Sequence, residues 1–193
     1  WLLILVIAIS FQVIPMFHVT PNYHKIISKY LPQVIFTGLL LINCFNIELI
    51  QKIGLFVICI SAITYALYSF KLLSKRRRKI PDMTVNCWRL ALISLFIASF
   101  ILSLRNIDSS DLAINILTMN HVKIDLLIGA LMVIGFACSV IIGMQYKIIP
   151  FLMYMHLQRL CGNDFDKVKR LPTMHTFMPA KRAKHQFKLH LVS

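Results

Sequence analysis

Five long apolar runs, each bounded by polar or charged residues, constrain this chain of 193 residues more than any other feature. A bilayer core about 30 Å thick is crossed by about 20 helical residues, which is roughly the length of each run. The runs lack the alternation of barrel strands, and a helix satisfies its own backbone hydrogen bonds in lipid. We therefore predict an all-α fold, a polytopic transmembrane helix bundle with about five spans, near residues 1–17, 31–49, 53–73, 87–104 and 124–145.

The composition favours a membrane protein over a soluble domain. Hydrophobic residues make up 58% of the chain, and the mean hydropathy is +0.74. An ordinary soluble domain has a smaller apolar share, because it must hide that surface from water. Few residues of the polar and charged types that act in catalysis or ligand binding therefore remain.

Both ends of the sequence are expected to be truncated. The chain opens at Trp1 inside an apolar run, without an initiator Met or a preceding basic region, which argues against a signal peptide. Residues 186–192 turn apolar again after a basic stretch. We therefore predict that residues 1–160 form part of a larger helical bundle, and that residues 161–193 form a basic cytoplasmic tail or loop leading toward a further span.

The net charge of +14 is distributed by loop. Basic residues are frequent after the first, third and fifth predicted spans, whereas the alternate loops hold only Lys52, Arg105 and Lys123. The positive-inside rule then places the amino end outside and the tail in the cytoplasm. This loop-by-loop pattern predicts a lipid bilayer as partner, and no nucleic acid.

One run of five basic residues follows the third predicted span: Lys75, Arg76, Arg77, Arg78 and Lys79. Such a run binds anionic headgroups at about 1 kcal/mol per charge. The more common interpretation is that the run only determines topology.

Small residues recur every four positions in the fifth predicted span, at Gly135, Ser139 and Gly143. This spacing lines them along one helix face and lets another helix approach closely. We predict tight contact with another transmembrane helix, of the same protein or of a partner subunit. The five cysteines form no CxxC pair and their number is odd, so neither a disulfide framework nor a structural metal site is predicted.

Candidate ligand-binding residues are sparse. In the predicted topology His18, His24 and His156 share the cytoplasmic side, so they are the candidates for cofactor binding, although solvated interface histidines are more common. Gln12 and Pro15 are the polar and helix-breaking residues of the first span, and Pro15 could free backbone carbonyls for a ligand. No catalytic constellation is present in the sequence.

Two segments, residues 11–23 and 143–158, combine prolines with aromatic and basic residues, as interface structures do. Together with the basic tail through His190, they resemble a little-characterised family of bacterial multi-span inner-membrane proteins. The part from Gly143 to Pro150 is also similar to the end of a helix in subunit I of haem-copper oxidases and in related membrane proteins linked to nitric oxide metabolism. The resemblance implies an all-helical redox scaffold that binds haem, and we carry over no ligand from it.

Three functional classes are therefore considered for this multi-pass membrane protein. The first is a haem- or respiration-associated protein, which the resemblance implies. The second is a small-solute permease, which Gln12 and Pro15 favour. The third is a non-catalytic assembly or scaffold protein, which the small-residue stripe favours; an enzyme acting through residues of this segment is the least expected.

Overall fold

The computed structural model describes residues 2–45, 47–76, 83–107, 121–162 and 185–190. The described residues form helices and contain no strand, which confirms the predicted all-α class. In chain order the elements are α1 (Leu2–His18), α2 (Lys25–Cys44), α3 (Glu48–Ser74), α4 (Met83–Ile107), α5 (His121–Ala130), the π-helix η1 (Leu131–Cys138) and α6 (Ser139–Cys161). A short helix follows at residues 185–190.

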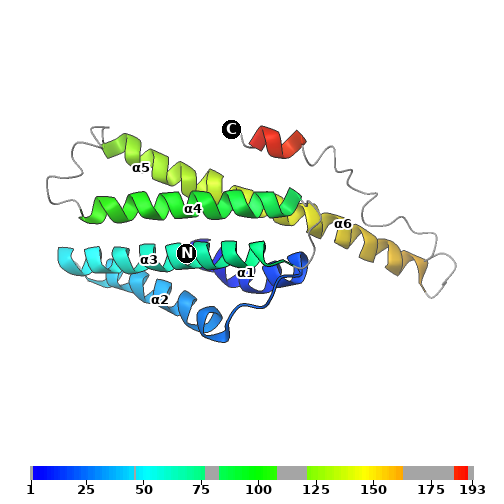
Figure 1. Cartoon of the computed structure of the whole chain (residues 1–193), viewed down its shortest axis with the longest axis horizontal. Coiled ribbons are helices and arrows are strands. Elements are labelled where there is room, and N and C mark those ends of the chain that lie inside the picture. The colour runs from blue at the N-terminus through cyan, green and yellow to red at the C-terminus, as the bar shows by residue number, and fades with distance from the viewer. Residues whose placement is uncertain (1, 46, 77–82, 108–120, 163–184, 191–193) are drawn as a thin grey trace.

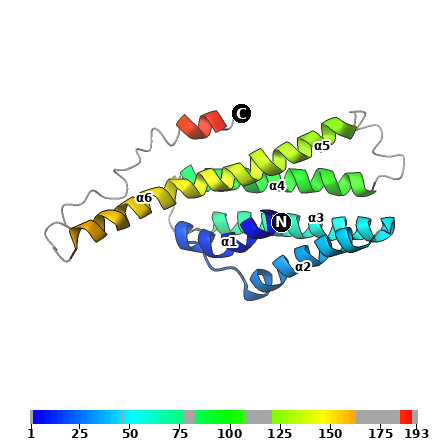
Figure 2. The same cartoon turned by 180° about the vertical axis from the view of Figure 1, so that it is seen from behind.

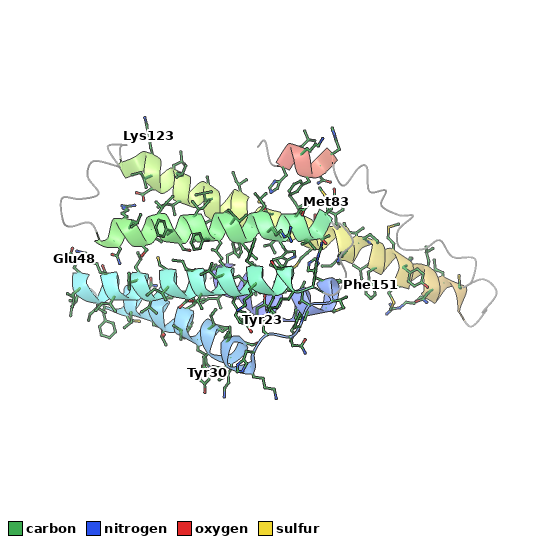
Figure 3. The ribbon with its side chains drawn as sticks, viewed as in Figure 1. Tyr23, Tyr30, Glu48, Met83, Lys123 and Phe151 are labelled. Atoms are coloured by element: carbon green, nitrogen blue, oxygen red, sulfur yellow. The ribbon has the colours of Figure 1, made fainter. Side chains whose placement is uncertain are left out.

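The long helices run alternately up and down, with α3 and α4 side by side in the middle (Figures 1 and 2). Figure 3 places Glu48 and Lys123 at one end of this bundle and Met83 at the other. We call the end where α1 and α3 finish and α2 and α4 begin the basic end, because Lys25, Lys29, Lys75 and Arg76 lie there. The other end is called the opposite end.

Within the described ranges, four helices are long and apolar enough to cross a membrane: Lys25–Cys44, Glu48–Ser74, Met83–Asn106 and Lys123–Cys161. The apolar helix α1 is shorter, at 17 residues. Large apolar side chains remain exposed along the helices, such as Leu67, Phe100 and Leu126. A soluble protein would bury such a surface, and lipid solvates it. These helices are compatible with an integral membrane protein.

The ends of two predicted spans differ from the helices. The second span was placed at residues 31–49, but α2 starts at Lys25 and ends at Cys44, so Glu48 begins the next helix. Phe45 and Ile47 are extended and separate α2 from α3, so the predicted break at residues 50–52 lay too late in the sequence. The fifth span was placed at residues 124–145, whereas the helix continues to Cys161.

The last helical stretch is unusually long. Residues Lys123–Cys161 form one continuous apolar helix of 39 residues, about 58 Å at 1.5 Å per residue. Its final part extends past the ends of α3 and α4 (Figures 1 and 2). Pro150 lies inside this helix, and the π-helix η1 widens it in the middle. Such π segments are rare and frequently occur at functional sites.

Glycines allow the closest helix contacts in the bundle. A Cβ at Gly54 of α3 would lie 2.9 Å from the carbonyl oxygen of Gly38 in α2. A Cβ at Gly135 or Gly143 would lie 2.7 or 2.9 Å from the Cβ of Ser94 or Cys87 in α4. The structure therefore places two residues of the predicted stripe directly against α4. The third, Ser139, is fully buried and its Oγ lies 2.7 Å from Nε2 of His190.

Candidate functional site

A pocket of about 430 Å³ lies at the basic end, between the second half of α1, the following loop and the first turn of α2. Its volume falls in the range of small-molecule sites, about 300–1,000 Å³. Three lining side chains are polar and uncharged, and the other four are apolar or aromatic: Gln12, Asn22 and Ser28, with Phe11, Pro15, Met16 and Tyr23. The pocket is therefore amphiphilic, and none of the described residues in its lining is charged.

Pro15 shapes the α1 wall of the pocket. Because proline has no N–H, the carbonyl of Phe11, four residues earlier, lacks its helical donor. Both residues line the pocket. Gln12, between them, is exposed on this apolar helix. Its side-chain amide is therefore available to hydrogen-bond a polar group in the pocket.

An aromatic cluster forms the inner wall. The ring of Phe11 contacts Tyr23 edge-on at a centroid distance of 4.8 Å, and it contacts Tyr65 of α3 in the same manner at 6.1 Å. Tyr23 also packs on Tyr68, at 5.7 Å. Edge-on aromatic pairs contribute about 0.5–1.5 kcal/mol beyond area burial. The cluster thus joins the pocket to the core of the bundle.

Buried hydroxyl groups fix this wall in place. The Tyr23 hydroxyl donates to Oγ of Ser69 at 2.9 Å, and the Tyr65 hydroxyl donates to Oγ of Ser10 at 2.7 Å. Ser10 in turn donates to the carbonyl of Ile7 at 2.6 Å. Burial raises the pKa of the Tyr23 phenol above its ordinary value, with a further contribution from Tyr65, so Tyr23 stays protonated and remains a donor.

Lys147 of α6 contacts the last turn of α1. Nζ of Lys147 donates to the carbonyl oxygen of Phe17 at 2.6 Å and lies 3.5 Å from Nδ1 of His18. The last carbonyls of a helix lack partners and carry partial negative charge, so a lysine there is stabilising. Val19 then ends the helix with a left-handed φ of 51°. This contact brings together the two segments that the sequence singled out, residues 11–23 and 143–158.

The three candidate histidines have different environments. His18 is buried beside Lys147, whereas His24, just before α2, and His156, in the distal part of α6, are exposed. Within the described ranges, no three His, Cys, Asp or Glu side chains are close enough to hold a metal ion. His18, His24 and His156 therefore do not form a three-ligand centre.

The basic run after α3 is only partly described. Lys75 and Arg76 follow the last turn of α3, while Arg77, Arg78 and Lys79 lie outside the described residues.

At the opposite end of the bundle, Glu48 pairs with Lys52 at 2.8 Å, and Asp125 pairs with Arg105. The second of these ion pairs joins α4 to α5.

Sequence reasoning missed the hydrogen bonds from Tyr23 and Tyr65, which join residues 46 and 55 positions apart. It also missed the pairing of Arg105 with Asp125. Both residues adjoin the same predicted outer loop, and that shared position was the available signal.

Comparison of the chain with protein-family models, curated proteins and solved structures found no match.

Proposed function

We propose that this membrane protein binds a small, neutral, amphiphilic solute in the pocket between α1 and α2, as the solute-binding site of a permease. The observation that carries the proposal is the pocket lining, which combines three uncharged polar side chains with aromatic and apolar ones. Pro15 adds a backbone carbonyl without its helical donor. In transporters, backbone groups freed from helical hydrogen bonds supply ligand groups.

The lining also defines the chemical class of the solute. The amides of Gln12 and Asn22 and the hydroxyl of Ser28 donate hydrogen bonds, and they match carbonyl or hydroxyl oxygens on a ligand. Phe11 and Tyr23 offer aromatic surface to a flat ring. A charged solute is not expected, because none of the described lining residues carries a charge that would offset the cost of desolvating it inside the pocket. The expected solute is thus a neutral ring compound that carries oxygen acceptors.

Replacing Gln12 with leucine tests this assignment. Benzophenone is a neutral aromatic ketone of suitable size, and 4-benzoylbenzoate is its anionic counterpart. Thermal aggregation of the purified protein is measured by size-exclusion chromatography after heating. With benzophenone at ten times its Kd, the aggregation midpoint should rise by about 3–6 °C. The Gln12→Leu variant should lose most of this rise, because the ketone loses its amide donor.

The matched control is Gln158→Leu, since Gln158 lies in α6 and bonds Tyr154 outside the pocket. That variant should keep the full response to benzophenone, and 4-benzoylbenzoate should give none in any variant. Equal stabilisation by both probes, or an unchanged response in Gln12→Leu, would contradict the proposal.

A haem- or respiration-associated function is the second proposal. It rests on the resemblance of residues 143–150 to the end of a helix in subunit I of haem-copper oxidases. The described positions of His18, His24 and His156 do not fit a shared ligand set, so we assign no haem ligand. A stoichiometric haem band in the reduced-minus-oxidised spectrum of the purified protein would support this function, and a featureless spectrum would contradict it.

For orientation we propose a bacterial inner membrane with the basic end toward the cytoplasm. The support is the asymmetry of lysine and arginine between alternate loops. In this orientation the pocket opens at the cytoplasmic headgroup level, where an amphiphilic solute concentrates.

A further inference from the structure

The described charges separate between the two ends of the bundle. Glu48 and Asp125 are the carboxylates of the described residues; both lie at the opposite end, and each is in an ion pair. The described part of the basic end holds cations and none of the described carboxylates: Lys25, Lys29, Lys71, Lys75, Arg76 and Arg89. Among the described residues, positive charge therefore predominates at the last turn of α3 and the first turns of α4.

Among these cations, Arg89 is the one with a buried donor that lacks a hydrogen-bond partner among the described residues. It lies in the second turn of α4 and is partly buried, and the donor is its Nε. A guanidinium at this depth in a membrane helix is costly unless an anion or water satisfies it.

The end of α3 supplies further cations close to the same level. Lys71 and Lys75 are exposed and Arg76 is partly exposed, at the last turn of α3 and just beyond it. The helices α3 and α4 pack antiparallel, so this turn of α3 lies beside the first turns of α4 (Figure 1). The dipole of α4 adds partial positive charge at its first turn.

We propose that Lys71, Lys75, Arg76 and Arg89 form a binding site for the headgroup of an anionic phospholipid, such as phosphatidylglycerol, at the basic end of α3 and α4. The phosphate oxygens accept hydrogen bonds from the guanidinium groups, which bind phosphate with two parallel N–H donors. The acyl chains lie on the exposed apolar side chains of α3 and α4, including Leu67, Phe70 and Ile93. A phospholipid satisfies the charges and the apolar surface together, which a free anion does not.

The test compares the protein in nanodiscs of phosphatidylcholine with the protein in nanodiscs that contain 30% phosphatidylglycerol. The anionic lipid should raise the melting midpoint by about 8–16 °C, on the basis of about 1 kcal/mol for each of the four cations. Native mass spectrometry of the same samples should find phosphatidylglycerol retained on the protein. Inorganic phosphate added to the phosphatidylcholine discs should give no such shift.

Two variants should lose the response, the single Arg89→Gln and the triple Lys71→Gln, Lys75→Gln, Arg76→Gln. The control Lys123→Gln, at the opposite end, should keep it. If Arg89→Gln does not fold, the triple variant decides, because Lys71 and Lys75 are exposed and Arg76 is only partly buried. Equal midpoints in the two lipids, equal loss in Lys123→Gln, or the same stabilisation by inorganic phosphate would each overturn the site.

Discussion

Replacing Gly54 with valine should force α2 and α3 apart and destabilise the bundle by about 1–3 kcal/mol, as overpacking of a close contact does. A Cβ at Gly54 would lie 2.9 Å from the carbonyl oxygen of Gly38 and 3.0–3.1 Å from side-chain atoms of Ile42 and Leu41. A backbone oxygen cannot rotate away, so one helix must move. The gain in helix propensity is less than about 1 kcal/mol and does not offset this cost.

The matched control is Gly129→Val in α5, where a Cβ would meet nothing within 4 Å. Unfolding in mixed micelles with increasing dodecyl sulfate, followed by circular dichroism, compares the two variants with the unaltered protein. Gly54→Val should unfold at a lower dodecyl sulfate fraction, and Gly129→Val should not. Equal midpoints for all three proteins would show that α2 and α3 do not approach each other at these glycines.

Replacing Tyr65 with alanine should have the largest effect on stability, about 3–5 kcal/mol, as for other buried aromatic residues. Tyr65 is completely buried, its ring supports Phe11, and its hydroxyl bonds Ser10. Alanine would leave a cavity behind the aromatic wall of the pocket. The same dodecyl sulfate titration measures the loss, and benzophenone binding should weaken because Phe11 loses its support.

The variant Tyr65→Phe separates the ring from the hydroxyl. It keeps the edge-on contact with Phe11 and removes one hydrogen bond, so the expected loss is about 0.5–1.5 kcal/mol. A loss as large as that of Tyr65→Ala would mean that the hydrogen bond, rather than the packing of the ring, holds α1 against α3.

The helical class and most spans could be predicted from the sequence, because a continuous apolar run of about 20 residues has few alternatives in lipid. The boundaries near Glu48 and Cys161 could not. The sequence is most polar at Gln51 and Lys52 between the second and third apolar runs, whereas the chain is extended earlier, at the apolar residues Phe45 and Ile47. The helix after Gln145 keeps apolar residues and tolerates Pro150, so its continuation leaves no clear signal.

The candidate site was only partly predictable. Gln12 and Pro15 were identified because a polar residue and a proline are unusual in an apolar run. Tyr23 and Ser69 gave no local signal, since their contact depends on how the loop after α1 folds against α3. The same limit applies to Lys147 and Phe17, which lie 130 positions apart. Periodicity reports which face of a helix is apolar, but it does not report which helices are neighbours.

Photolabelling with benzophenone tests the proposed pocket most directly, because the excited ketone inserts into C–H bonds that it touches. The protein in phosphatidylcholine nanodiscs would be irradiated with benzophenone, and the labelled peptides would be identified by mass spectrometry. We expect the label to concentrate on Met16 and its neighbours in the pocket lining, and we expect the amount of label there to decrease in the Gln12→Leu variant. Label spread evenly over the exposed faces of α3, α4 and α6, and unchanged in Gln12→Leu, would contradict the proposed pocket.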